Sequence, residues 1–126
     1  VRMVLDPRLG LVVEAARSKK AFRIRLLDVH GIATFTDAFA FMSGGSDRQN
    51  RAIAEEVESH LKKRGHRPIA TEGDAIGAWI LLDYGDFIVH VMDEDSRRHY
   101  NLEELWKAGR ELELPPEPPH PGSAQG

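Results

Sequence analysis

Residues 79–92 read WILLDYGDFIVHVM, and they carry the strongest structural signal in the chain. Two apolar runs, Trp79 to Asp83 and Phe87 to Met92, flank Tyr84-Gly85-Asp86. Short apolar runs of this kind are typical of strands, and a glycine between them supplies the backbone freedom that a tight turn requires. The pattern therefore predicts a β-hairpin.

The chain before the hairpin begins with a helical pattern and continues with extended ones. Asp6-Pro7 is typical of an N-cap followed by proline at the first helical position, which predicts a helix over residues 7–19. Alternating polar and apolar residues then predict a strand over 23–29, and a short apolar run predicts a second, buried strand over 38–42.

The longest helix is predicted to follow directly. Ser46 and Gln49 form a capping box, in which each side chain can satisfy a backbone N–H of the other residue. The helix is expected to end near residue 64, because Gly65 can adopt the left-handed cap conformation. Proline cannot donate a backbone hydrogen bond, so residues 68–70, which begin with Pro68, are predicted to form a short edge strand.

After the hairpin, the sequence predicts first a helical segment and then a proline-rich segment. Residues 95–100 suit a helical turn, and Leu102, Leu105 and Trp106 can pack a last short helix onto the sheet. Five of the seven prolines then fall after Glu111, which favours an extended, unstructured tail. These patterns predict a folded domain over residues 1–109 and a proline-rich tail over 110–126.

The order of these elements predicts the fold class. Helix, two strands, helix, three strands and helix, with both a hairpin and helical crossovers, indicate an α/β, or α+β-like, single domain. We expect a mixed sheet of about five strands that is covered by helices.

Composition supports a folded, soluble chain. The 126 residues are 41% hydrophobic and 29% charged, without cysteine. No apolar stretch is long enough to cross a membrane and no leader pattern is present, so a cytoplasmic location is expected.

Residues 1–67 carry 13 Lys and Arg against 8 Asp and Glu, whereas residues 68–126 carry 4 against 12. This uneven charge suits a surface that meets a protein.

The most enzyme-like feature is Gly44-Gly45-Ser46, at the end of a strand and the start of a helix. Such a turn can hold a phosphate, but it lacks the lysine of a P-loop, and capping already explains Ser46. The paired carboxylates of a nucleotidyltransferase are missing, and the six histidines lack the spacing of a metal site. We therefore expect no enzyme activity, cofactor or metal, and a nucleotide-binding enzyme is the less favoured alternative.

The aromatic residues of the second half leave two interpretations open. Trp79, Tyr84, Tyr100 and Trp106 lie in or just after the hairpin. Clustered aromatic side chains usually form core, yet an aromatic patch on a small domain without an active site is also typical of a protein-binding hot spot. His90 is expected to be packed or partly exposed on the face of its strand that Ile88 and Met92 share.

A series of short motifs resembles the RsfS/Iojap family of ribosomal silencing factors over about residues 8–107, in the same order and at similar spacing. The motifs are Leu27-Asp28-Val29, Phe35-Thr36-Asp37, Ser43-Gly44-Gly45-Ser46-Asp47-Arg48-Gln49, Glu72-Gly73, Gly77-Ala78-Trp79, Leu82-Asp83-Tyr84-Gly85-Asp86, Val89-His90-Val91 and Tyr100-Asn101-Leu102-Glu103-Glu104-Leu105-Trp106. Phe39-Ala40-Phe41-Met42 departs from the family, which usually has more aliphatic residues there.

The resemblance implies a function without catalysis. Members of the family are understood to bind the large ribosomal subunit through its ribosomal protein fourteen and to block subunit association sterically, which represses translation when nutrients are limiting. Some members are linked to late large-subunit assembly. The family fold resembles a nucleotidyltransferase without its catalytic carboxylates, and a homodimer off the ribosome is expected to compete with ribosome binding.

The resemblance also implies a contact surface, centred on the hairpin and the segment after it. Trp79 and Tyr84 are expected to be aromatic anchors, Asp83 and Asp86 to accept hydrogen bonds from basic side chains, and Gly85 to form the turn. A minor contact of Arg48 and Arg51 with ribosomal RNA is a further alternative. The full set of expected partner-binding residues is Trp79, Asp83, Tyr84, Gly85, Asp86, His90 and Tyr100.

Overall fold

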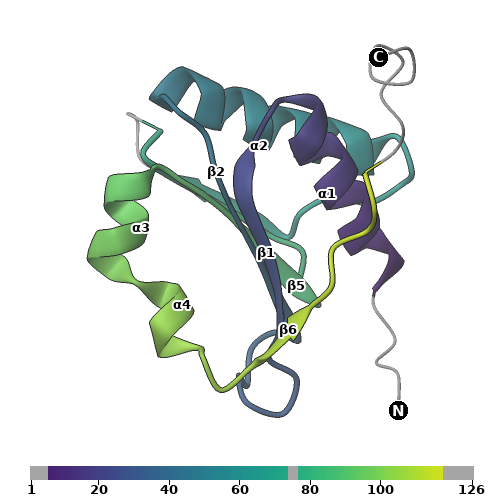
Figure 1. Cartoon of the computed structure of the whole chain (residues 1–126). Helices are drawn as coiled ribbons and strands as arrows, with labels where there is room; N and C mark the ends of the chain where they lie inside the picture. Colours follow the sequence, from purple (N-terminus) through teal and green to yellow (C-terminus); the bar gives the residue numbers. More distant parts are fainter. Residues whose placement is uncertain (1–5, 74–76, 118–126) are drawn as a thin grey trace.

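The computed structural model describes residues 6–73 and 77–117. These residues form a six-stranded sheet with helices on both faces (Figure 1). The elements in chain order are α1 (Pro7–Ser18), β1 (Phe22–Asp28), β2 (Ala38–Ser43), α2 (Asp47–Lys62), β3 (Ala70–Gly73), β4 (Trp79–Asp83), β5 (Phe87–Met92), α3 (Glu94–Tyr100), α4 (Leu102–Leu105) and β6 (Arg110–Leu112).

The sheet is mixed, with the strand order β3-β4-β5-β2-β1-β6. β2 and β5 are parallel, and the other neighbouring pairs are antiparallel. α2 belongs to the long crossover that parallel neighbours require. The predicted α/β class with a mixed sheet covered by helices is therefore confirmed, with one strand more than the five expected.

The two faces of the sheet carry separate clusters of apolar side chains. α1 and α2 cover one face, where Val12, Val57 and Leu61 belong to the larger core. α3 and α4 lie over the other face, where Leu102 and Trp106 pack against a smaller cluster (Figure 1).

The predicted hairpin is confirmed. Because successive side chains of a strand point to opposite faces of the sheet, its residues are divided between the two clusters. Trp79 pairs with Met92, and Asp83 pairs with Ile88. Leu81 and Ile88 belong to the smaller cluster, under α3 and α4. The hairpin residues in the larger core, under α1 and α2, are Ile80, Leu82, Tyr84, Phe87, Val89 and Val91.

The two long helices begin as the sequence predicts. Asp6 caps α1, and the Ser46 hydroxyl accepts a hydrogen bond from the Gln49 backbone N–H. The Gln49 side chain, however, accepts from the Gly45 N–H, one residue before the partner that a capping box would give it. Gly65 follows α2 with a φ of +86°. No helix of the described residues is long and apolar enough to span a membrane.

The edge strand β3 lies later than predicted. The sequence places it at 68–70, and the structure places it at Ala70–Gly73. Pairing with β4 begins just after Pro68, where the Ile69 N–H donates to the Asp83 carbonyl oxygen at 2.7 Å. The ladder therefore starts at the first residues that have an N–H to donate.

A sixth strand forms where the sequence predicts the start of the tail. Arg110–Leu112 pairs with β1, and Leu114 packs against the larger core. Gly109 allows this approach, because a Cβ there would lie 2.8 Å from the Asp28 carbonyl oxygen. The boundary predicted at residue 109 is therefore too early for the sheet.

The chain after β6 contacts α1. The Arg17 Nη1 donates a hydrogen bond to the Pro115 carbonyl oxygen at 2.8 Å. Residues 118–126 of the predicted tail lie outside the described residues, so the division of the chain into a domain and an unstructured tail stays a prediction.

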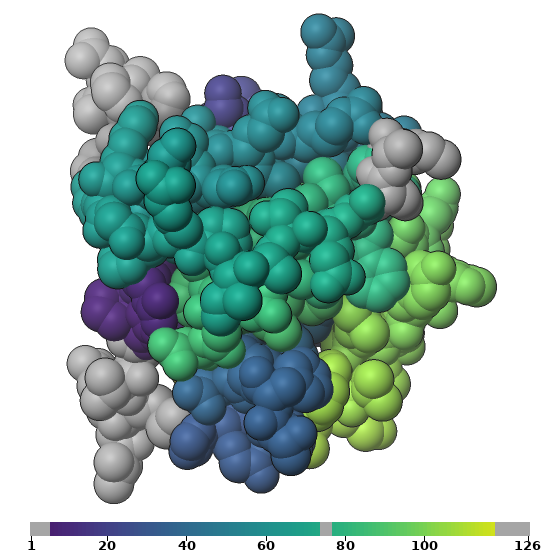
Figure 2. All heavy atoms as spheres, turned by 180° about the vertical axis from the view of Figure 1, so that it is seen from behind, coloured from purple at the N-terminus to yellow at the C-terminus, as the bar shows by residue number. Residues whose placement is uncertain are grey.

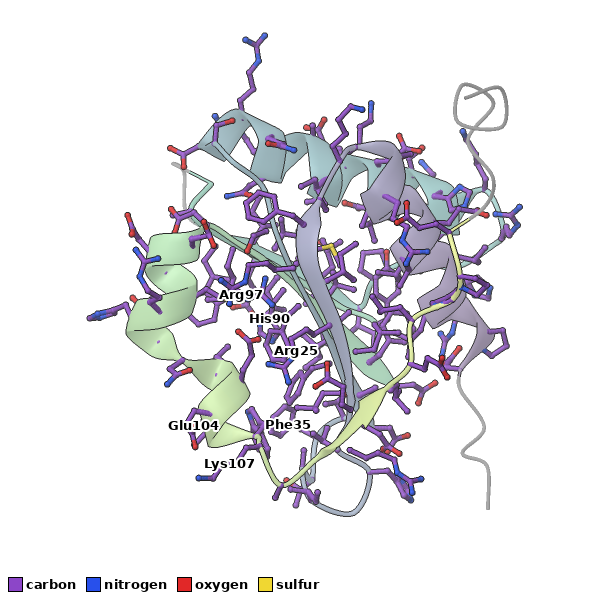
Figure 3. All side chains as sticks on the ribbon, viewed as in Figure 1. Arg25, Phe35, His90, Arg97, Glu104 and Lys107 are labelled. Carbon is purple, nitrogen blue, oxygen red and sulfur yellow. The ribbon has the colours of Figure 1, made fainter. Side chains whose placement is uncertain are left out.

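A partly buried network of ion pairs fastens α3 and α4 to the sheet. Arg97 of α3 is 4% exposed, and it donates to the Ser43 Oγ and to the Glu103 Oε1, both at 2.9 Å. Glu103 also accepts from the Arg25 Nη1 at 2.7 Å, and Arg25 pairs with Glu111 of β6. Arg25 and Arg97 lie between the helices and the sheet (Figure 3).

This network depends on the charge of Glu103. Burial alone raises the pKa of Glu103, but hydrogen bonds from Arg97 and Arg25 outweigh burial and lower that pKa from its ordinary 4.5. The ionised carboxylate therefore stabilises the folded chain above pH 4.5. That contribution is lost as the pH falls through the lower pKa of the folded state.

Replacing Glu103 by Gln should lower the free energy of unfolding by about 2–3 kcal/mol at pH 7, because Arg97 would stay buried without its counter-charge. Urea unfolding at pH 7 measures this loss. Glu104→Gln is the matched control, since Glu104 makes only an exposed pair with Lys107 and should cost less than about 0.5 kcal/mol. Equal losses for the two variants would contradict a stabilising role of the network.

Candidate docking surface

The Trp79 and Tyr100 rings lie together at the surface, at one end of the hairpin. Trp79 is the first residue of β4 and Tyr100 is the last residue of α3. Their ring centroids are 4.7 Å apart, and Tyr100 is 52% exposed. Aromatic side chains held together at an edge of the fold give a large contact area at little cost in side-chain entropy.

His90 supports Trp79 from beneath. The Trp79 Nε1–H donates to the His90 Nδ1 at 3.1 Å, so Nδ1 carries no proton and the neutral ring is protonated at Nε2. His90 is 5% exposed, and its ring stacks on Phe41 at 5.2 Å. His90 therefore fixes the orientation of Trp79 and offers almost no surface of its own. It lies between α3 and the sheet (Figure 3).

Burial lowers the pKa of His90 to about 4. A neutral imidazole at physiological pH keeps Nδ1 free to accept from Trp79. Between pH 6.5 and about 4 the unfolded chain binds a proton at this histidine and the folded chain does not. The stabilisation is therefore complete above pH 6.5 and is lost as the pH falls toward 4.

A shallow depression beside Trp79 extends this surface toward the edge of the sheet. Its lining residues, from β3 and β4, are Glu72, Gly73, Trp79 and Leu81. Its walls are mainly apolar, and Glu72 and Gly73 are exposed. The region around β3 and β4 faces the viewer in Figure 2, which looks at the molecule from behind.

The turn residues lie at the other end of β4. Asp83 is four residues from Trp79, which is about 13 Å along a strand. Its Oδ1 accepts from the Gly85 N–H at 2.8 Å, and Gly85 has a φ of +86°. The exposed Asp86 carboxylate accepts from the Arg8 Nη2 at 2.7 Å. The Asp83 carboxylate therefore orders the turn, and the Asp86 carboxylate is already paired with Arg8.

Tyr84 does not join Trp79, although the family resemblance implies that both are aromatic anchors. Tyr84 is 5% exposed and stacks on Phe87 at 4.9 Å, in the larger core. Tyr84 lies five positions after Trp79, and an odd offset along a strand points two side chains to opposite faces of the sheet. The structure therefore brings together Trp79, His90 and Tyr100, places Asp83, Gly85 and Asp86 at the far turn, and buries Tyr84.

A second group of aromatic rings lies on the same face of the sheet. The Phe35 ring, 58% exposed in the loop before β2, lies 5.8 Å from the Trp106 ring and 6.1 Å from the Phe39 ring. Phe39 contacts His90 at 5.5 Å, so these rings continue from the Trp79 surface. Phe35 is expected from the sequence only as part of the family motif Phe35-Thr36-Asp37 and is absent from the expected partner-binding residues.

The Gly44-Gly45-Ser46 turn is occupied by side chains of its own helix. The Gly44 N–H donates to the Asn50 Oδ1 at 2.8 Å, and the Gly45 N–H donates to the Gln49 Oε1 at 2.7 Å. Four acidic residues, Asp47, Asp93, Glu94 and Asp95, line the adjacent hollow with one cation, Arg98, which is paired with Asp95. A phosphate there would find these two donors in use and negative charge beside it.

Replacing His90 by Phe should remove part of the acid sensitivity of this fold. In the parent, lowering the pH from 7 to 5 should reduce the free energy of unfolding by about 2 kcal/mol through this one group. Urea unfolding at both pH values measures the difference, and the variant should show a drop smaller by that amount. An unchanged drop would mean that His90 titrates normally in the folded chain.

Sequence comparisons place the chain among known proteins. A family model described as "Ribosomal silencing factor during starvation" matches residues 5–125. The protein named "Ribosomal silencing factor RsfS" in Halalkalibacterium halodurans is 38% identical over 84% of this chain and 91% of its own. The protein of that name in Bacillus subtilis is 39% identical, over 78% and 83%. A mouse protein named "Mitochondrial assembly of ribosomal large subunit protein 1" is 30% identical, over 78% and 44%.

Solved structures agree with the sequence comparisons. A protein from Chromobacterium violaceum has a TM-score of 0.79 at 31% identity and covers 91% of this chain and 95% of its own. A protein from Bacillus halodurans has a TM-score of 0.74 at 38% identity, over 84% and 96%. The resemblance found in the sequence motifs is therefore confirmed, and the chain belongs to the RsfS family of ribosomal silencing factors.

Proposed function

We propose that this chain binds the large ribosomal subunit in the cytoplasm, through the subunit's ribosomal protein fourteen, and thereby blocks subunit association. Translation would fall under nutrient limitation because a large subunit that carries this domain cannot join a small one. The action is steric and needs no catalysis. The observation that supports it best is the pair of half-buried Trp79 and exposed Tyr100, held over the neutral His90 in a chain of this family.

The chemistry of this surface suits a protein partner. Tryptophan and tyrosine are enriched among the residues that dominate binding energy, particularly where a partner can exclude water from them. The apolar depression beside Trp79 offers a place for a side chain of the partner. His90 acts in this proposal as a positioning residue, because it orients the indole ring without reaching the surface.

The turn of the hairpin would supply the polar rim. Asp83, Gly85 and Asp86 lie about 13 Å along β4 from the aromatic pair, which is within the width of a protein interface. Asp86 is exposed and would attract basic side chains of a ribosomal protein, in competition with Arg8. Tyr84 is left out of the proposed contact, since its ring is buried on the opposite face.

Two related roles use the same surface. The name of the mouse relative favours a second candidate function, a factor for assembly of the large subunit, which would use the same docking site. Depletion that leaves immature large subunits in rich medium would distinguish assembly from silencing. A homodimer through the aromatic pair would compete with the ribosome, because only the free monomer would bind and its concentration would rise less than in proportion to the total protein.

Replacing Trp79 and Tyr100 together by Ala should weaken binding to isolated large subunits at least about tenfold, because each ring is a candidate hot spot. Co-sedimentation measures binding, and circular dichroism checks the fold. Tyr100→Ala alone removes an exposed ring, so it tests the surface without disturbing the core.

Tyr84→Phe is the matched control for this experiment. It removes only the buried hydroxyl of an aromatic residue in the same hairpin, and it should bind like the parent. A parent that fails to sediment with large subunits would overturn the proposed function. Loss of binding in Tyr84→Phe, with Tyr100→Ala unaffected, would move the contact to the other end of β4.

A further inference from the structure

A dense group of cations lies between the end of α2 and the start of β3. Residues 62–67 read KKRGHR, with four Lys or Arg and one His. Lys62, Lys63, Arg64 and Arg67 are all exposed. We call this group the basic turn, defined by Lys62, Lys63, Arg64, His66 and Arg67.

Lys62, Lys63 and Arg67 differ from six other cations of the described residues, which pair with carboxylates; Lys19, Lys20, Arg48 and Arg110 likewise lack such a pair but are not gathered in one turn. Arg8, Arg23, Arg25, Arg97, Arg98 and Lys107 each form an ion pair with Asp or Glu. Within residues 6–73 and 77–117, no ion pair to a carboxylate is recorded for Lys62, Lys63 or Arg67. Arg64 contacts only the His60 ring, at 3.3 Å. The positive charge of this turn is therefore available to an external anion.

The helix dipole explains only part of this pattern. Cations in the last turn of a helix interact favourably with its carbonyl end, so Lys62 and Lys63 stabilise α2. The effect falls off within that turn, and Arg67 lies beyond Gly65, which has left the helix with a φ of +86°. Gathering four permanent charges in six residues also costs repulsion, which an anionic partner would relieve.

The basic turn and the proposed docking surface are joined by one strand. The chain passes from Arg67 directly into β3, which pairs along β4 from Asp83 at one end to Ile80 at the other. The basic turn is therefore next to the Asp83 end of β4, and Trp79 is at the other end. Figure 2 shows the end of α2 and the β3–β4 region on one side of the molecule.

We infer that Lys62, Lys63 and Arg67 bind the phosphate backbone of ribosomal RNA beside the protein that the aromatic surface contacts. This inference rests on the proposed function. A basic ribosomal protein would repel the turn, so the complementary surface must be anionic, and RNA is the anionic component of the large subunit. Exposed lysine and arginine side chains suit sequence-independent phosphate contacts.

The test is the salt dependence of binding to purified large subunits, measured for the full chain from low to high KCl. Each phosphate contact contributes about 0.7–0.9 to the slope of log K against log salt. The triple variant Lys62→Gln/Lys63→Gln/Arg67→Gln should therefore bind more weakly at low salt, and its slope should be shallower by about 2–3.

The matched control, Lys19→Gln/Lys20→Gln/Lys107→Gln, removes the same net charge from exposed residues elsewhere. Its slope should stay close to that of the parent. Equal changes in both triple variants would overturn the inference, because they would report net charge alone. An unchanged slope in the basic-turn variant, with the parent still bound, would also overturn it and leave the proposed function standing. A parent that does not bind at any salt concentration would overturn both.

A carbodiimide, which joins lysine amines directly to carboxylates, separates RNA from an acidic protein surface. Treated complexes should contain no adduct of Lys62 or Lys63 with a ribosomal protein, whereas ultraviolet irradiation should join the peptide around Arg67 to ribosomal RNA. Carbodiimide adducts at both lysines without any RNA adduct would assign the turn to a protein carboxylate instead.

Discussion

β2 and β5 lie side by side at the centre of the sheet, and all residues of both strands are buried. A sheet whose central strands are apolar on both faces must be covered on both faces. α1 and α2 cover one face completely enough to bury Tyr84. α3 and α4 are short and cover only part of the other face. The aromatic surface at Trp79 and Tyr100 lies on this partly covered second face, and it is the docking surface that we propose.

The short helices are held by charge as well as by apolar contact. No residue of α4 is buried, so its own packing cannot fix its position strongly. The pairing of Arg97 and Arg25 with Glu103 instead links α3, α4 and the sheet. Tyr100 is the last residue of α3, and the paired residues Arg97 and Glu103 precede and follow it in the sequence. The same ion pairs therefore fix the position of the exposed Tyr100 ring relative to Trp79. Stability and the shape of the docking surface thus share one network.

The sequence predicts most of the fold because its signals are local. Caps, the glycine turn and apolar runs specify α1, α2, β2 and the hairpin without reference to distant residues. β6 was missed because its pairing depends on Gly109 approaching β1, a contact between segments far apart in sequence. Trp79, His90 and Tyr100, which the sequence names as contact residues, lie together in the structure, but the burial of Tyr84 shows that residue type alone is insufficient. Counting strand positions would have separated Tyr84 from Trp79, whereas no local pattern reveals that Arg97 is buried with Glu103.

The hydrogen bond between the Trp79 indole and His90 also has an optical consequence. The chain has two tryptophans, and Trp106 packs against Phe35 and Phe39 instead of belonging to the Trp79–Tyr100 pair. Trp79 is half-buried with its N–H already satisfied inside the protein, so covering its remaining face changes mainly the polarity around the ring. Its intrinsic fluorescence emission would therefore shift to shorter wavelength on complex formation, which makes the native chain a label-free reporter of its own docking.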